Sequence, residues 1–187
     1  MASKFRNAGQ TCVCANRLLI QSGIYEAFAG KLTQRVADLS VGPGLSGTFD
    51  QGPLIDGRAI AKAESHVRDA VSHGARVETG GHRIDGPGHF FAPTLLSDVA
   101  AEDTDEEAIR LANDTDAGLA AYLFTSSLER RWRIPEALDY GMVGLNTALI
   151  STEVAPFGGI KQSGLGREGS SAGMDDYLET RFTCIAV

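Results

Sequence analysis

The residues with the clearest chemical meaning lie near the start of the chain, where two cysteines, Cys12 and Cys14, are separated by one residue. Cys12 follows a polar turn that contains Gly9 and precedes a short apolar run. This pattern places a sulfur near the start of an ordered element, where backbone N–H groups can stabilise a thiolate and a developing oxyanion. The sequence therefore predicts nucleophilic catalysis by Cys12. The alternative is that Cys12 is a small buried hydrophobic residue.

The other cysteine and histidine residues indicate neither a metal site nor a disulfide framework. Three cysteines are an odd number and do not form the pattern of a secreted protein, so we expect a reducing, cytoplasmic location. No Cys/His pair follows the two neighbouring cysteines at the spacing of a zinc site, and we expect no metal. Four histidines lie in helical or loop patterns and are expected to be structural or to face solvent: His66, His73, His82 and His89.

Length and composition are those of an ordinary α/β protein. The chain has 187 residues, of which 43% are hydrophobic and 22% are charged, enough for one domain with a sizeable core. A formal net charge of −7 argues against a partner that is nucleic acid or an anionic membrane. No apolar stretch approaches the length of a membrane span, and we expect no signal peptide before the first element.

Hydrophobic spacing and turn residues predict the elements that must position Cys12. Four longer helices are predicted at residues 24–39, 55–73, 105–113 and 127–138, and Pro135 should kink or shorten the fourth. A fifth, short helix is predicted to end at 175–177. Extended segments, the second of them broken by Pro93, are predicted at 76–79, 90–99, 119–124, 142–146 and 181–187. Cys184, in the last strand, is expected to fill the core. Because strands and helices alternate, we expect an α/β fold with a mostly parallel, helix-covered sheet.

Four stretches in order resemble the aldehyde dehydrogenase superfamily. The segment 5–17, FRNAGQTCVCANR, is similar to its catalytic-cysteine segment, and the Cys-Val-Cys form resembles the succinate-semialdehyde dehydrogenase branch. The other matching stretches are 52–55, then 112–115 with 118–121, and finally 151–170. The resemblance covers residues 5–187 and implies the fold of the family's catalytic domain over residues 1–187. It also implies that the terminal strand joins subunits, so we expect a homo-oligomer.

The resemblance assigns the nucleophile to Cys12. In the family, the cysteine attacks an aldehyde to give a thiohemiacetal, which transfers hydride to NAD or NADP, and the resulting thioester is hydrolysed. A cysteine suits both steps, because it is a strong nucleophile and a competent thioester leaving group. By the same resemblance, Cys14 is a candidate redox-regulatory residue that forms a reversible disulfide with Cys12. A reduced Cys14 packed beside the site is the alternative.

Three further residues match positions that hold the substrate in this branch. Arg6 matches the residue that grips the carboxylate of an acid-semialdehyde, and Ser151 matches its hydroxyl partner; Arg supplies a planar fork suited to a carboxylate. Phe157 resembles an aromatic wall of the aldehyde tunnel. The alternatives are a surface salt bridge for Arg6, a cap or turn for Ser151 and ordinary packing for Phe157. Succinic semialdehyde, glutarate semialdehyde and related small molecules fit these anchors equally well.

The sequence departs from the family pattern in two places. By the resemblance, we expect the family's amino-terminal part, which holds the cofactor-binding domain, the general-base glutamate and an oxyanion-binding asparagine, to have no counterpart in these residues. We also expect no counterpart near 100–104 of the family's internal segment that includes a cofactor-binding glutamate. The Gly164-Leu165-Gly166 run is not a dinucleotide fingerprint, because no strand leads directly into it. The cofactor-binding residues, and the choice between NAD and NADP, therefore stay unknown.

We expect this chain alone to be a weak or inactive dehydrogenase. The alternatives are a non-catalytic oligomerisation fragment or half of a split enzyme.

Overall fold

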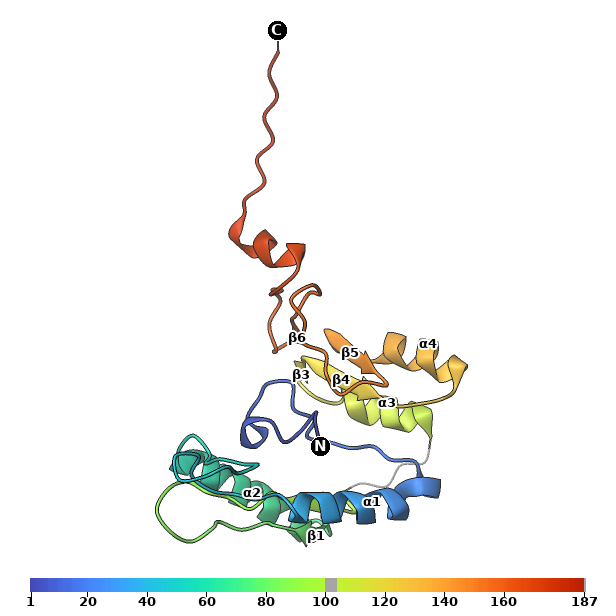
Figure 1. Ribbon diagram of the computed structural model, residues 1–187. Helices are drawn as coiled ribbons and strands as arrows, with labels where there is room; N and C mark the ends of the chain where they lie inside the picture. The colour runs from blue at the N-terminus through green and yellow to red at the C-terminus, as the bar shows by residue number, and fades with distance from the viewer. Residues whose placement is uncertain (100–103, 187) are drawn as a thin grey trace. The chain divides into compact units, whose positions relative to one another are not determined.

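The computed structural model describes residues 1–99 and 104–186 (Figure 1). The chain divides into two compact units, Met1–Ala108 and Ile109–Val187. No glycine- or proline-rich linker marks this division, which falls inside helix α3 (Asp105–Asn113). The discontinuity predicted near 100–104 lies, apart from Thr104, outside the described residues.

The first unit places two helices against a small sheet. Helices α1 (Ser22–Ala37) and α2 (Gly57–Ser72) both contact strand β1 (Arg76–Thr79), which pairs antiparallel with β2 (Leu95–Ser97). The Asp56 side chain accepts hydrogen bonds from two backbone N–H groups in the first turn of α2 and so caps that helix. Three side chains form the buried centre of this layer, namely Val36, Ile60 and Ala75.

The second unit contains a parallel strand–helix–strand motif. Strand β4 (Ala120–Leu123) pairs parallel with β5 (Met142–Leu145), and α4 (Leu128–Ala137) connects them and packs on β4. Ser127 caps α4, and the helix ends two residues after Pro135. Ile134 and Met142 are the buried apolar side chains of this motif. A short antiparallel pair, β3 (Ala117–Gly118) with β6 (Ile160–Lys161), and the 3-10 helix η2 (Ser171–Tyr177) complete the unit.

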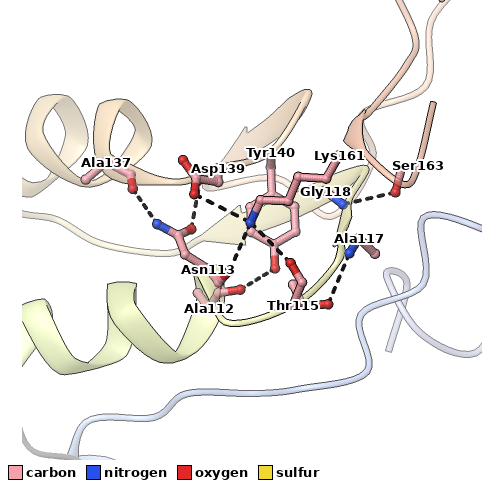
Figure 2. A network of polar contacts seen from close by, with 10 residues as sticks. All are labelled: Ala112, Asn113, Thr115, Ala117, Gly118, Ala137, Asp139, Tyr140, Lys161 and Ser163. Carbon is pink, nitrogen blue, oxygen red and sulfur yellow. Dashed lines mark hydrogen bonds and ion pairs between the residues drawn. The ribbon is translucent and has the colours of Figure 1, made fainter. Parts of the chain in front are cut away.

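A polar network centred on Lys161 joins these elements (Figure 2). The Lys161 ammonium donates to the carbonyl oxygens of Asn113 and Thr115, at 2.9 and 3.2 Å, and lies 3.5 Å from an Asp139 carboxylate oxygen. The Asn113 side chain also bonds to the backbone of Ala137 and Asp139 at 2.8 Å each. The end of α3 is thereby held to the end of α4 and to the 157–164 segment.

The α/β class and the helix positions are confirmed, whereas two predictions about strands are wrong. Only the β4–β5 pair is parallel among three two-stranded sheets in the described residues, so the sheet is not mostly parallel. Residues 181–186 form no strand, and Cys184 is exposed rather than in the core. A strand needs a partner to satisfy its backbone groups, and the described chain gives this segment none. No helix of the described chain is long and apolar enough to cross a membrane.

Candidate active site

The segment that carries Cys12 is a loop folded around one carbonyl group. The carbonyl oxygen of Arg6 accepts hydrogen bonds from Gly9 N at 2.9 Å and from the Thr11 hydroxyl at 3.4 Å, and the Cys14 thiol lies 3.8 Å from it. The turn inside the loop is the 3-10 element η1 (Asn7–Gly9), whose three residues all have positive φ. Ala8 has no side chain suited to this left-handed conformation, so the loop contains local backbone strain.

The loop presents its two sulfur atoms differently. Cys12 is exposed, whereas Val13 and Cys14 are buried, Cys14 with 8% of its surface accessible. Both cysteines are free thiols. In the described part of the chain, neither the thiol nor the backbone N–H of Cys12 makes a hydrogen bond. An accessible sulfur beside an available N–H donor is the arrangement that attack on a carbonyl requires, because the N–H can bind the developing oxyanion.

Arg6 is an exposed cation at the start of this loop. Within residues 1–99 and 104–186 its guanidinium makes no ion pair or hydrogen bond, so the alternative of a surface salt bridge is not observed. The second nearby cation is Lys4, which donates to the Asn16 side chain at 2.6 Å. Burial lowers the pKa of the Lys4 ammonium, and interaction with Cys14 partly opposes this lowering. The sequence reasoning assigned no role to Lys4, although it lies two residues before Arg6.

Two glutamines that the sequence reasoning also left without a role connect the loop to residues 50–55. The Gln10 side chain accepts from Ile55 N at 2.9 Å and donates to the Asn7 carbonyl at 3.0 Å. The buried Gln51 side chain donates to the Phe5 carbonyl at 2.9 Å. Gln10 lies inside the cysteine motif, and Gln51 immediately precedes the matching stretch 52–55. Their positions in and beside these motifs were therefore the sequence signal that could have marked them as functional residues.

Ser151 and Phe157 lie in the second unit. Ser151 is exposed and its hydroxyl makes no hydrogen bond to the described residues, so the capping alternative is not observed. Phe157 is half-buried, and its backbone pairs with Glu168 through two hydrogen bonds of 2.7 Å. It lines a cavity of about 580 Å³ together with Arg167, Asp176 and other residues of this unit. Phe157 therefore has both a structural contact and access to a cavity.

The other titratable groups form no second candidate centre. No group of three His, Cys, Asp or Glu side chains in the described ranges is arranged to hold a metal ion. All four histidines are exposed, which confirms that they face solvent. Gly164, Gly166 and Gly169 lie between the two-residue strand β6 and the 3-10 helix η2, so a short strand does precede the Gly164-Leu165-Gly166 run, separated from Gly164 by two residues.

Solved structures define the class to which this fold and thiol loop belong. A succinate-semialdehyde dehydrogenase from Burkholderia pseudomallei superposes on 100% of this chain with a TM-score of 0.93 and 51% identity, over 42% of its own chain. A betaine aldehyde dehydrogenase from Staphylococcus aureus, solved in complex with NAD+, has a TM-score of 0.84 and 33% identity over 95% of this chain and 40% of its own. The fold is that of an aldehyde dehydrogenase catalytic domain.

The Aldehyde dehydrogenase family matches residues 1–183, and the chain belongs to this family. A mitochondrial succinate-semialdehyde dehydrogenase of Arabidopsis thaliana is 52% identical over 99% of this chain and 38% of its own length. A glutarate-semialdehyde dehydrogenase of Pseudomonas putida is 53% identical over 99% of this chain and 42% of its own. A succinate-semialdehyde dehydrogenase [NADP(+)] of Escherichia coli is 52% identical over 100% of this chain and 42% of its own length. The chain thus spans about two fifths of the length of these relatives.

Proposed function

We propose that this chain is the catalytic domain of an NAD(P)-dependent dehydrogenase that oxidises a short acid-semialdehyde to the dicarboxylate. The observation that carries the proposal is the exposed thiol of Cys12 on the same loop as the exposed guanidinium of Arg6, which has no partner within residues 1–99 and 104–186. A thiol attacks an aldehyde carbon and a guanidinium binds a carboxylate, and an acid-semialdehyde carries one group of each kind. The succinate- and glutarate-semialdehyde dehydrogenases among the similar proteins support this substrate class.

In the proposed reaction the Cys12 thiolate attacks the aldehyde carbon. A carbon–sulfur bond forms while the carbonyl electron pair moves to oxygen, and the Cys12 N–H binds that oxygen. NAD or NADP, when bound, would accept the hydride that the adduct must lose, and no described residue is assigned to it. Water then hydrolyses the resulting thioester, which releases the dicarboxylate and regenerates the thiol.

Three other residues have roles proposed from the resemblance to the family. Ser151 is proposed as a hydroxyl donor to the substrate carboxylate, and Phe157 as part of the wall around the aldehyde chain. Cys14 regulates the nucleophile by forming a disulfide with Cys12, a step in which an oxidant such as a peroxide removes two electrons and two protons from the two thiols. The burial of Cys14 and the exposure of Cys12 mean that this step requires the loop to rearrange.

These 187 residues alone are proposed to have weak or no dehydrogenase turnover, because they represent about two fifths of the length of the similar enzymes. Alignment with these enzymes runs over 203 to 205 positions, more than the chain has residues, which supports the proposal of an internal missing segment. A cytoplasmic location is proposed because all three cysteines are free.

A homo-oligomer is also proposed, and one observation favours assembly as a second function. Phe182 and Ile185, in the extended terminal segment, expose 89% and 80% of their surfaces, and exposed large apolar side chains are candidates for burial in an interface. A partner strand of a second copy would cover them. A non-catalytic oligomerisation fragment would show self-association. Half of a split enzyme would instead gain turnover when it is mixed with a cofactor-binding chain.

Protection of Cys12 by aldehydes tests the enzymatic proposal without any cofactor. The chain is treated with iodoacetamide in the presence of succinic semialdehyde or of butanal, which has the same four carbons and no carboxylate, and alkylation is mapped by mass spectrometry. We expect succinic semialdehyde to protect Cys12 at lower concentration than butanal, and Arg6→Gln to remove the difference. Exposed Cys184 serves as the internal control. Equal labelling of Cys12 with and without either aldehyde would overturn the proposal.

Dehydrogenase turnover is tested by NAD(P)H formation from succinic semialdehyde at 340 nm. We expect no more than a trace rate from the purified chain. Robust turnover would contradict the proposed weakness of the chain while leaving the substrate assignment intact.

A further inference from the structure

We propose that Gln10 and Gln51 are separate positioning residues for the two ends of the candidate site. Gln10 sets the position of the Cys12 nucleophile, and Gln51 sets the position of the Arg6 guanidinium. This inference rests on the proposed acid-semialdehyde chemistry and adds to it two residues that do not touch the substrate. Both residues act through backbone groups of the Cys12 loop.

Gln10 uses both ends of its amide to hold the loop against residues 53–55. Its oxygen accepts the Ile55 N–H at 2.9 Å, and its nitrogen donates to the Asn7 carbonyl at 3.0 Å, with a longer 3.5 Å contact to the Pro53 carbonyl. Asn7 is the first residue of the strained turn η1, so the amide ties that turn to a distant segment of the same unit. Cys12 is two residues beyond Gln10, and loss of this tether lets the strained turn relax and displaces the thiol.

Gln51 holds the other end of the loop from inside the unit. Only 5% of its surface is exposed, and its side-chain nitrogen donates to the carbonyls of Phe5 at 2.9 Å and Asp50 at 2.6 Å. The Phe5 carbonyl belongs to the peptide group that leads into Arg6, so this bond fixes the backbone from which the guanidinium extends. The amide cannot turn over, because its oxygen would then face two carbonyl oxygens.

The buried oxygen of Gln51 explains why this orientation has a cost. It has no hydrogen-bond partner within residues 1–99 and 104–186, and an unpaired buried acceptor destabilises a fold. A glutamine that only filled space would be replaceable by an apolar residue of the same size without loss. The Phe5 bond is therefore the feature that gives the amide a specific role.

The two tethers predict two different defects. Displacement of Cys12 weakens reaction with any aldehyde, whereas displacement of Arg6 weakens only the recognition of a carboxylate. The protecting concentration of butanal divided by that of succinic semialdehyde is the measured ratio, and only loss of carboxylate recognition lowers it. Displacement of Cys12 and a general loss of stability both leave the ratio unchanged, and alkylation of buried Cys14 separates these two, because it accelerates only when the loop unfolds. The ratio is measured by the same iodoacetamide labelling of Cys12, on the same 187-residue chain.

We expect Gln51→Met to reduce this ratio about tenfold toward one while protection by butanal stays unchanged. We expect Gln10→Ala to weaken protection by both aldehydes about tenfold without changing the ratio. Hydrogen exchange at the Ile55 amide should accelerate in Gln10→Ala and not in Gln51→Met. The matched control is Gln34→Met, because the Gln34 amide bonds to Asp38 at the end of α1 and should leave both measurements unchanged.

Alkylation of buried Cys14 reports whether a variant keeps the loop folded. If Cys14 in Gln10→Ala or Gln51→Met labels as fast as Cys184, Gln10→Glu and Gln51→Asn replace them. The first keeps only the acceptor for Ile55 N–H and should fall between the wild type and Gln10→Ala. The second keeps an amide that is too short to reach Phe5 and should reduce the ratio. A wild-type ratio in both Gln51 variants, or wild-type protection in both Gln10 variants, overturns the inference. Absence of protection in the wild type overturns the proposed function instead.

Discussion

The ammonium nitrogen of Lys161 lies 2.9 Å from the carbonyl oxygen of Asn113, the last residue of helix α3. The last carbonyls of a helix have no partner inside the helix and carry partial negative charge, so a lysine at this position both bonds to them and neutralises them. Lys161 reaches this position from a left-handed backbone conformation, with φ of 55°. A tertiary contact, 48 residues apart in sequence, thus ends the helix and anchors the segment that follows Phe157.

Replacement of Lys161 by methionine tests this anchor. The change keeps the length of the side chain and removes its bonds to Asn113 and Thr115, so we expect the free energy of unfolding to fall by about 1–3 kcal/mol. Urea unfolding followed by circular dichroism measures the change. Lys62→Met, at an exposed position on α2, should cost less than half as much. An equal loss in the two variants would show that the ammonium network does not stabilise the unit.

Substitution of the two neighbouring cysteines should separate their roles. Slow cleavage of an activated ester by this chain should disappear in Cys12→Ala, because the exposed nucleophile is removed, and should survive in Cys14→Ala. Release of 4-nitrophenol from 4-nitrophenyl acetate provides the measurement, with Cys184→Ala as the control for a second exposed thiol. Ester cleavage that persists in Cys12→Ala would assign the reactivity to another group.

Stability should fall in acid partly through the cap of α2. A hydrogen bond from the Arg58 side chain, followed by one from Ala59 N, lowers the pKa of Asp56 below its ordinary value. A group whose pKa is lower in the folded state contributes stability above its unfolded pKa, and this contribution is lost as the pH falls through the folded pKa. We therefore expect the free energy of unfolding to decline below about pH 4.

The Asp56→Asn variant isolates that contribution, because asparagine still caps a helix and does not titrate. Its free energy of unfolding should decline less than that of the wild type between pH 5 and pH 3, as measured by urea unfolding at each pH. Parallel pH curves for the two proteins would contradict the assignment to Asp56.

Two glycine substitutions should change stability in opposite directions. Gly30 lies in α1 with no atom near its missing side chain, so Gly30→Ala should stabilise the chain by about 0.5–1 kcal/mol. A side chain at Gly141 would overlap the Gly158 carbonyl oxygen, so Gly141→Ala should destabilise it by about 1–3 kcal/mol. Thermal unfolding of the two variants beside the wild type measures both changes. Stabilisation by Gly141→Ala would contradict the observed approach of these two segments.

Local sequence signals predicted the helices well, because their causes are local. The predicted helix 105–113 has the observed bounds of α3, and 24–39 and 55–73 overlap α1 and α2 with ends shifted by one or two residues. The periodic apolar residues that predicted these helices act within a few residues, as does the Asp56 side chain that caps α2 in the structure. The motif around Cys12 likewise indicated the family, and the family match to residues 1–183 confirms it.

Strand pairing and the support of the site depended on contacts between distant residues. The sequence predicts the strand at 142–145, but only the tertiary structure pairs it in parallel with 120–123. The tertiary structure also leaves residues 181–186 without a partner strand among the described residues. The motif contains Gln10, but the Ile55 N–H that it binds is 45 residues away. The sequence by itself determined where helices form and which side chains are candidates for reaction. The tertiary structure decided that Cys12 is exposed and Cys14 buried, because burial depends on which remote segments cover a residue.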